Sequence, residues 1–285
     1  MPGVSVIVSL YNHSRYLAQC VHSVLDQSYA DLEVVIVDDA STDDSLEVAR
    51  SLQRLDPGRV KVYSNPGNLG VSRTRNFGVY KSGAPILAFL DADDYWRPDK
   101  LEKQVRAFGV DPELGVCHCG ATIDCDAQSA RWVAENRGMS PDTFTRWAGS
   151  FDTFCKEAEH FGQPDYFRRL LVSNNICLSS VAVRRSAFKQ ARGFVDGLRC
   201  QCEDWLLWLK LSMLTRFRSI PEQLAVYRFH HASHTAQVFM RADFDFLTVR
   251  SEMIQAARSF DPVRFDALFA AVRLRQEPCS GAHRP

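Results

Sequence analysis

Two groups of aspartates in the first hundred residues carry the chemistry that this sequence could perform. Asp38 and Asp39 follow one apolar run, and Asp91, Asp93 and Asp94 follow another. Carboxylates held this close together repel one another, so a cation is the natural way to keep them ionised. Hard oxygen ligands suit Mg²⁺ or Mn²⁺, which proteins usually share with substrate phosphates. We therefore expect a divalent cation here rather than a solvated acidic turn or a helix cap.

The apolar runs before these aspartates alternate with helical patterns over residues 1–115. We expect strands over Val4–Leu10, Leu32–Val37, Val60–Tyr63 and Ile86–Leu90, and helices over Ser14–Ser28, Ser41–Leu52 and Gly70–Lys81. Strands separated by helices pair in parallel, with helices on both faces of the sheet. Because ligands bind at the carboxyl ends of such strands, Ser9, Tyr11 and the two aspartate groups should meet at one edge.

The pattern is less regular beyond Asp111. We expect a strand over Gly115–Ile123, regular structure over Ile176–Val183, helices over Arg185–Gln190 and Glu203–Leu214, and a strand over Leu224–Tyr227. Residues 126–165 are polar and aromatic-rich without clear periodicity, which indicates an insertion that covers a site. Helical periodicity returns over residues 240–275, and the last ten residues are expected to be frayed.

Composition and charge exclude several classes of protein. The 285 residues include 34 Lys and Arg against 34 Asp and Glu, whereas a nucleic-acid module normally carries a basic excess on one face. No stretch approaches the roughly 18 apolar residues of a transmembrane helix, and the N-terminus lacks a signal-peptide pattern. The nine cysteines are expected to be reduced structural thiols. We therefore expect a cytoplasmic protein that binds no nucleic acid.

Six blocks of sequence, in order, are similar to those of one known family. They are Val4–Asn12, Val37–Asp43, Asn68–Asn76, Phe89–Asp94, Arg192–Asp196 with Cys202–Trp205, and Tyr227–Thr235. Through them, over roughly residues 3–236, the chain resembles the family 2 inverting glycosyltransferases. The resemblance implies an α/β fold of GT-A type, with a Rossmann-like, mostly parallel sheet flanked by helices.

The same resemblance implies a division of the chain. Residues 1–236 would form the GT-A glycosyltransferase domain, with a nucleotide-binding half over residues 1–115 and an acceptor half over residues 116–236. Residues 237–285 would form a C-terminal helical extension with a frayed tail. The helices of this extension could form a homodimer interface, contact the inner face of a membrane, or cover the core.

On the donor side, the resemblance implies a role for each residue. Tyr11 would stack on the nucleotide base, and Asp39 would accept a hydrogen bond from it. Asp91 would lie near the ribose or the cation, and Asp93 would coordinate a Mn²⁺ or Mg²⁺ ion that bridges the diphosphate. The donor-binding set also includes Ser9, Gly70 and Arg75, the last of which would either touch the donor or form a structural ion pair.

On the acceptor side, Asp204 would be the general base that deprotonates the acceptor hydroxyl, with Glu203 and Trp205 beside it. His230 would add a contact to the cation or the diphosphate. The candidate platforms for sugar stacking are Trp132, Trp147, Trp205 and Trp208, although Trp208 is more often the kind of residue found in a core. Without the resemblance, Asp204 would be interpreted as a helix N-terminal charge favoured by the helix dipole.

The implied function is inverting transfer of a sugar from a nucleoside-diphosphate donor, most often a UDP-sugar, to a glycan, lipid-linked or other acceptor hydroxyl. Synthesis of a surface glycan or polysaccharide would suit it. The alternative is a non-catalytic nucleotide-sugar binding module, whose mark would be loss of Asp93 or Asp204, and both are present. A phosphotransferase of the haloacid dehalogenase type also has D-x-D after a strand, but its nucleophile follows the first strand, which here ends in Ser9-Leu10-Tyr11-Asn12.

Overall fold

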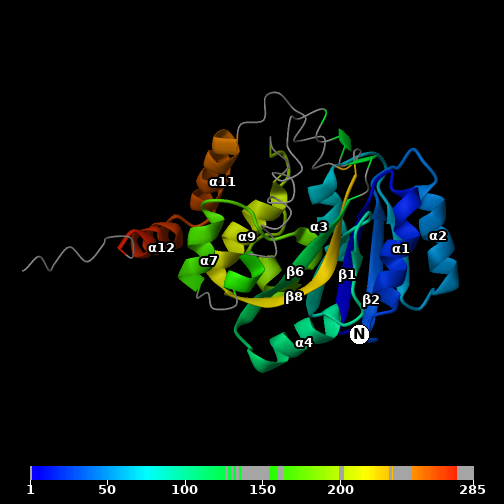
Figure 1. Cartoon of the computed structure of the whole chain (residues 1–285), viewed down its shortest axis with the longest axis horizontal. Helices are drawn as coiled ribbons and strands as arrows, with labels where there is room; N and C mark the ends of the chain where they lie inside the picture. Colours follow the sequence, from blue (N-terminus) through cyan, green and yellow to red (C-terminus); the bar gives the residue numbers. More distant parts are fainter. Residues whose placement is uncertain are drawn as a thin grey trace, which may run out of the picture.

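A mixed sheet of eight strands forms the centre of the protein (Figure 1). The computed structural model describes residues 2–125, 128–129, 131–132, 135, 154–158, 163–198, 202–230, 233 and 246–274. The strand order is β3-β2-β1-β4-β7-β6-β8-β5. Neighbours pair in parallel among the first four strands in this order and between β6 and β8, and in antiparallel fashion at β4–β7, β7–β6 and β8–β5.

The first ninety residues fold as the sequence predicts. The strands are β1 (Val4–Leu10), β2 (Leu32–Asp38), β3 (Val60–Ser64) and β4 (Ile86–Asp91), and the helices are α1 (Ser14–Leu25), α2 (Ser45–Leu55) and α3 (Val71–Lys81). Strand β2 is buried along its whole length, as expected of a strand covered by helices on both faces. The expected α/β class is therefore confirmed.

The rest of the described chain adds four strands and further helical segments, among them residues 154–158. The other elements have defined bounds. They are β5 (Tyr95–Trp96), α4 (Lys100–Val110), β6 (Leu114–Cys125), α7 (Gln163–Leu170), a 3₁₀ turn (Leu178–Ser180), β7 (Val181–Arg184), α8 (Arg185–Gln190), α9 (Glu203–Leu214), β8 (Arg216–Phe229), α11 (Phe246–Phe260) and α12 (Pro262–Leu274). The sequence patterns predict neither β5, α4 nor α7, and they predict only the second half of β8.

Two of these omissions have a clear physical origin. Helix α4 buries Lys100 and Gln104 together with its apolar residues, so its inner face does not look hydrophobic in the sequence. Strand β8 contains Pro221, which normally ends a strand because it has no N–H to donate. Pro221 and Glu222 fall where the register of β8 against β6 shifts, so no ladder bond is lost at the proline.

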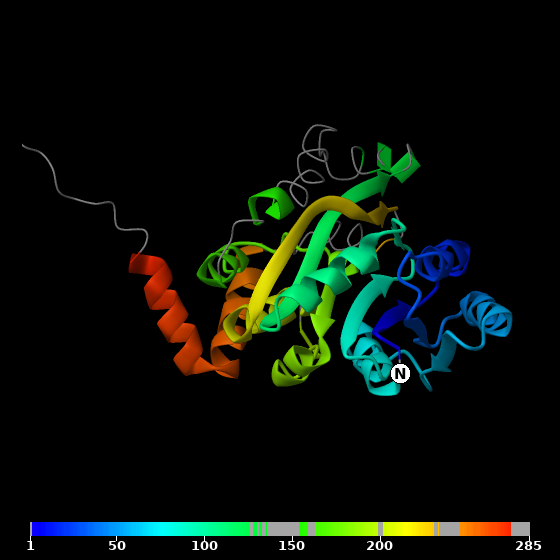
Figure 2. The same ribbon diagram turned by 90° about the horizontal axis from the view of Figure 1, so that it is seen from below.

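Helices cover both faces of the sheet and enclose two apolar cores. Helices α1, α2 and α4 pack on one face, and α3, α7, α8, α9, α11 and α12 contribute to the core on the other. Both views place α11 and α12 at the end of the molecule far from α1 and α2 (Figures 1 and 2). Met253 and Phe265 of these two helices are almost completely buried. The extension therefore covers part of the core.

The sheet register brings the ends of three strands to the same level. Leu10 of β1 pairs with Asp38 of β2, and Ser9 pairs with Asp91 of β4. The polar residues that follow these strands consequently share one edge, as the sequence predicts. The short β5 then pairs with β8, with Tyr95 opposite Val226, and this pairing brings the end of β8 beside the aspartates that follow β4.

Two further features concern the thiols and the helices of the described residues. The seven cysteines that the structure describes are all free thiols. None of the helices in these ranges has the length and apolar character needed to span a membrane.

Candidate active site

The loops that follow β1 and β2 have an unusual backbone. Asn12 has φ 57° and Ala40 has φ 59°, a left-handed conformation that is rare for residues other than glycine. The Asn12 side chain compensates by accepting a hydrogen bond from the Thr42 N–H at 2.7 Å. The Asp43 carboxylate accepts bonds from the N–H groups of Ser14 and Ser45. The starts of α1 and α2 are thus tied together beside the shared edge of the sheet.

Tyr11 and Asp39 both lie at this edge, but Tyr11 is exposed and Asp39 is buried. The Tyr11 side chain is 43 % exposed and is open to a ligand. Asp39 is buried, and its carboxylate accepts hydrogen bonds from the Asn65 side chain at 2.7 Å and from the backbone N–H groups of Leu69 at 2.8 Å and Gly70 at 2.9 Å. Gly70 has φ 86°, which glycine adopts without strain. Asp39 therefore holds the loop that leads into α3.

Asp91 is joined to the start of α9 through Arg75. The guanidinium of Arg75 donates to the Asp91 carboxylate at 2.7 Å and also to the carboxylate of Glu203 at the start of α9. The Arg75 side chain is only 6 % exposed, so this is a buried ion-pair network rather than a surface contact. The structural ion pair, one of the two alternatives that the sequence leaves for Arg75, is therefore present.

Asp204 lies in the first turn of α9, next to this network. Its carboxylate accepts hydrogen bonds from the Trp205 N–H at 2.6 Å and from the Asn174 side chain at 3.1 Å. Burial, together with the charge of Glu203, raises the pKa of Asp204 to about 7, although Arg75 and the two hydrogen bonds act in the opposite direction. A carboxylate with a pKa near neutrality is well suited to act as a general base.

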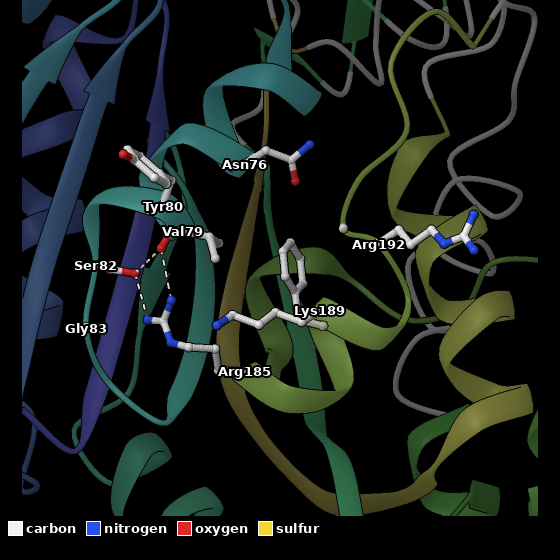
Figure 3. A pocket seen from close by; sticks show the side chains of 10 residues that line it. Asn76, Val79, Tyr80, Ser82, Gly83, Arg185, Lys189 and Arg192 are labelled. Atoms are coloured by element: carbon white, nitrogen blue, oxygen red, sulfur yellow. Dashed lines mark hydrogen bonds between the residues drawn. The ribbon is translucent and has the colours of Figure 1, made fainter.

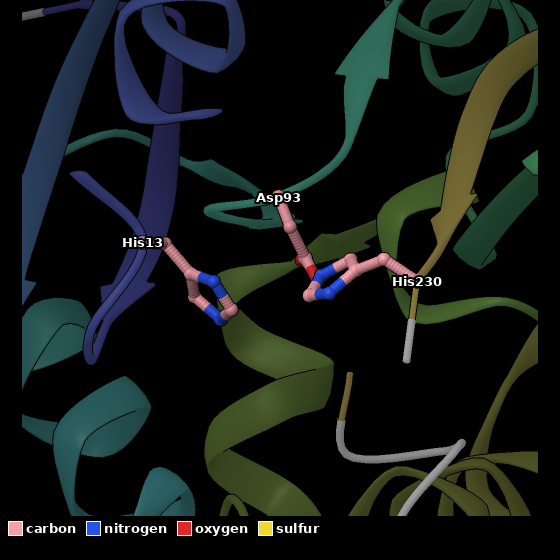
Figure 4. Close-up of side chains that lie close together, drawn as sticks. All are labelled: His13, Asp93 and His230. Carbon is pink, nitrogen blue, oxygen red and sulfur yellow. The ribbon is translucent and has the colours of Figure 1, made fainter. Parts of the chain in front are cut away.

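Asp93 is associated with two histidines (Figure 4). His230 Nε2 lies 3.1 Å from Asp93 Oδ2, and ligand atoms of His13, Asp93 and His230 all lie within 4.8 Å of one another. Burial alone would raise the pKa of Asp93, but the hydrogen bond from His230 and the charges of His13 and His230 lower it. Asp93 and His230, the two residues predicted as cation contacts, therefore lie side by side.

Asp94 has partners that differ from those of Asp91 and Asp93. It is completely buried, accepts a hydrogen bond from the hydroxyl of Ser179, and accepts another from the Arg228 N–H at 2.8 Å. Burial and the charges of Asp93 and Asp91 raise its pKa well above the ordinary value. The side chain of Arg228 donates to the Asp93 carbonyl oxygen at 2.8 Å, which fixes the aspartate loop against β8.

The structure corrects the prediction for the tryptophans and refines that for Glu203. Trp205 is 2 % exposed, and its indole donates to the Leu170 carbonyl oxygen at 2.7 Å. Trp208 is fully buried. Both rings belong to the core because α9 is apolar on nearly all sides, so neither is a surface on which a sugar can stack. Glu203 contacts Arg75 and orients the network.

Some expectations fall on parts of the chain outside the described residues. These are Trp147, most of the insertion over residues 126–165, and the tail beyond residue 274. Trp132 is described, and it packs beside Phe229.

The sequence patterns miss two polar residues of the site. His13 lies two residues beyond Tyr11, in the loop at the carboxyl end of β1, and that position alone could have indicated it. Asn174 lies in an irregular segment after α7 and has no periodic or motif signal. Its contact with Asp204 depends on how α7 and α9 pack.

A separate hollow of about 500 Å³ lies between α3 and α8 (Figure 3). Three cationic side chains line it, Arg185, Lys189 and Arg192. The Arg185 guanidinium is occupied by hydrogen bonds to the Ala84 and Val79 carbonyl oxygens and to the Ser82 hydroxyl, which close the C-terminal end of α3. None of the residues predicted from the sequence for catalysis, donor binding or metal binding lines this hollow, so it is distinct from the candidate active site.

Two solved structures have the same fold. The chain aligns with Staphylococcus aureus TarS in complex with UDP-GlcNAc at a TM-score of 0.66 and 18 % identity, covering 96 % of this chain and 72 % of that one. It aligns with the mannosyltransferase PcManGT of Pyrobaculum calidifontis, in complex with GDP-Man and Mn²⁺, at 0.57 and 20 %, covering 97 % and 76 %. The predicted GT-A architecture is therefore confirmed.

Sequence relatives and a family model agree with the fold. An uncharacterized glycosyltransferase of Nostoc sp. is 43 % identical over 81 % of this chain. TuaG of Bacillus subtilis, named for teichuronic acid biosynthesis, is 42 % identical over 36 % of this chain. The chain matches 66 % of the length of the first relative and 41 % of the second, less than two thirds of each. The model of glycosyl transferase family 2 matches residues 5–192, and this chain is therefore a member of that family.

Proposed function

We propose that this chain is an inverting glycosyltransferase that moves a sugar from a nucleoside-diphosphate donor, preferably a UDP-sugar, to an acceptor hydroxyl. The observation that carries the proposal is the buried link from Asp91 through Arg75 to Glu203. This link joins the D-x-D loop to α9, which carries Asp204 in its first turn. A cation-binding carboxylate and a base with a pKa near 7 are thereby held on one rigid frame.

The donor set fits a divalent cation. A carboxylate and imidazoles converge at Asp93, and oxygen and nitrogen donors of this kind suit Mn²⁺, with Mg²⁺ as the alternative. Asp93 and His230 would hold the ion. When bound, it would neutralise the negative charge that develops on the leaving diphosphate.

The side chains of the chain itself supply binding and proton transfer. The exposed ring of Tyr11 is available to stack on the nucleotide base, and Asp39 keeps the neighbouring loop in shape through its three hydrogen bonds. Asp204 takes the proton of the acceptor hydroxyl as that oxygen attacks the sugar. A single base on the side opposite the leaving group gives in-line attack and hence inversion of the anomeric centre.

Relatives support the choice of substrates. TarS is seen in complex with UDP-GlcNAc and PcManGT with GDP-Man and Mn²⁺, and TuaG is named for teichuronic acid biosynthesis. We propose by analogy that the acceptor of this chain is a growing glycan, free or lipid-linked.

The test is thermal stabilisation by UDP, GDP and dTDP, each with and without Mn²⁺. A ligand at 100 times its Kd should add about 2.7 kcal/mol to the unfolding free energy. We expect UDP to raise the melting temperature in the presence of Mn²⁺ and Asp93→Ala to abolish that rise. Asp44→Ala is the matched control, because Asp44 is exposed and makes no side-chain cap bond to α2. No rise with any nucleotide would refute the proposal.

Turnover separates the enzyme from a binding module. We expect the protein to release UDP from a UDP-sugar in the presence of a glycan acceptor, and Asp204→Asn to bind UDP with unchanged stabilisation but to release none. Stabilisation by UDP without release from any of several UDP-sugars would leave a nucleotide-sugar binding module.

A further inference from the structure

The most informative feature that the proposed function leaves unused is His13. His13 lies outside the six blocks of sequence that carry the family resemblance. Its ring lies beside Asp93 and His230. Figure 4 shows His13 and His230 approaching from opposite sides, with Asp93 extending toward them. The two imidazole centroids are 5.9 Å apart, with an interplanar angle of 86°.

We propose that His13 is a third protein ligand of the cation, so that the site presents two imidazoles and one carboxylate. This inference rests on the proposed function only for the presence of a divalent cation. Two ligand atoms at right angles around an ion, with bonds of about 2.1–2.2 Å, lie about 3.0–3.1 Å apart. The 3.1 Å between Asp93 Oδ2 and His230 Nε2 has that value. The ligand atoms of all three residues lie within 4.8 Å of one another, close to the roughly 4.2–4.4 Å between two ligands on opposite sides of such an ion.

The surrounding structure fixes the position of His13 through its backbone. The His13 N–H donates to the Ser45 hydroxyl at 2.8 Å, and its carbonyl oxygen accepts from the N–H groups of Tyr16 and Leu17 in the first turn of α1. The imidazole has no hydrogen-bond partner among the residues that the structure describes. Its ring nitrogens therefore have no other role within these residues, and changing the ring leaves the backbone bonds in place.

The other two ligands are oriented by neighbours. The ring of Tyr16 packs against His230 with centroids 5.0 Å apart, and Arg228 lies over Tyr16 at 4.6 Å. Arg228 also donates to the carbonyl oxygen of Asp93. Outer contacts of this kind hold metal ligands in place and are important for affinity. The pattern is what a site prepared to hold an ion requires.

The composition of the site predicts its choice of ion. Mg²⁺ strongly prefers oxygen ligands and near-ideal octahedral geometry, whereas imidazole nitrogen suits softer divalent ions. Two imidazoles with one carboxylate should therefore favour Mn²⁺ over Mg²⁺. The set carries a single negative charge when both rings are neutral, which leaves positive charge on the ion for the oxygens of a diphosphate.

The experiment measures bound Mn²⁺ directly, by electron paramagnetic resonance titration with and without UDP, and counts coupled nitrogens by electron spin echo envelope modulation. We expect two imidazole nitrogens in the wild type and one in His13→Gln, with Mn²⁺ affinity at least about tenfold weaker in the variant. His22→Gln is the matched control, because His22 is an exposed histidine on α1, the helix that His13 precedes. His13→Asp should shift the preference from Mn²⁺ toward Mg²⁺.

Two results would overturn this inference, and they differ in what they say about the proposed function. If the wild type binds Mn²⁺ through one imidazole, or if His13→Gln keeps both nitrogens and full affinity, His13 is no ligand, while the proposed function keeps its cation. If the wild type binds no Mn²⁺ with or without UDP, the cation itself is lost from the proposal. Stabilisation by UDP alone would then show whether donor binding remains.

Discussion

Asp91 and Asp93 are two residues apart in the sequence, yet their negative charges are balanced by different partners. Asp91 is paired at 2.7 Å with Arg75, a buried guanidinium that stays protonated at all ordinary pH values. Asp93 is paired with an imidazole at 3.1 Å and has no Lys or Arg ion-pair partner in the described chain. Asp91 thus has a permanent positive partner in Arg75. The charge of Asp93 is left to be balanced by a protonated histidine or by a bound cation.

Asp94, in the same turn, is held by hydrogen bonds from uncharged groups. It accepts hydrogen bonds from a hydroxyl and a backbone N–H but has no ion pair with a Lys or Arg of the described residues, and its pKa is raised. The comparison teaches that spacing in a D-x-D-D sequence does not by itself assign roles. The partners of each carboxylate decide whether its charge is paired by an arginine, is left open to a cation, or is disfavoured by burial.

The largest effect is expected at the acceptor end of the Asp91 network. Asp204→Asn keeps the size of the side chain but removes the base, so kcat should fall by about 10²–10⁴-fold. Asp196→Asn, an exposed aspartate paired with Arg73, should leave kcat within about twofold if the base is specific to Asp204. A loss of less than tenfold in Asp204→Asn would assign the base elsewhere.

The same variant tests the pKa of Asp204 through stability. The pKa in the folded protein, about 7, lies above the value of about 3.9 for an unfolded chain. Wild-type stability therefore falls as pH rises through this interval, and the amide does not titrate. We expect Asp204→Asn to gain stability relative to the wild type between pH 5 and pH 8, measured by urea unfolding at each pH.

The second prediction breaks the permanent pair. Arg75→Met leaves the carboxylates of Asp91 and Glu203 without their positive partner. We expect this change to lower the unfolding free energy by about 3–5 kcal/mol. Arg54→Met, which removes an exposed pair with Glu47, should cost less than about 1 kcal/mol. Without added metal, Asp93→Asn should cost less than Arg75→Met because it strands no permanent charge. Equal costs for the two sites would contradict the contrast between Asp91 and Asp93.

A smaller effect is expected at the donor base. Tyr11→Ala removes a stacking surface and should raise the donor KM by roughly 5- to 150-fold, corresponding to about 1–3 kcal/mol, with little change in kcat. Tyr11→Phe keeps the ring and should behave like the wild type. Because the side chain is exposed, neither variant should lower the melting temperature, and a fall in kcat alone would refute the assignment.

The smallest expected effect is a shift of the pH–rate profile when the charge of Glu203 is removed. Its negative charge is one of the causes that raise the pKa of Asp204, so Glu203→Gln should move the acidic limb of the pH–rate profile to lower pH by on the order of one unit. The wild-type rate should fall about tenfold per pH unit below pH 7, because only the ionised base is active. An unmoved limb in Glu203→Gln would show that another group sets it.

The sequence predicts the donor half well because each signal there is local. Apolar runs such as Val4–Leu10 end in polar residues, and the level ends of the strands follow from parallel pairing. The acceptor half depends on contacts between distant segments. Strand β5 has only two residues and exists because β8 lies beside it, and the inner face of α4 is partly polar. The buried Trp205 was misassigned because a tryptophan near a base resembles a sugar platform until packing is known.

The order of the strands has a consequence for how the protein is made. Strand β8 lies between β6 and β5, and it ends beside His230, more than a hundred residues after Asp93. During synthesis, the D-x-D loop therefore leaves the ribosome long before the strand that β5 pairs with. Contacts over such a separation form late and slowly. A nascent chain that stops before residue 216 would contain the aspartates but not the β8 that places His230 beside them. The proposed cation site therefore forms only after β8 has joined the sheet.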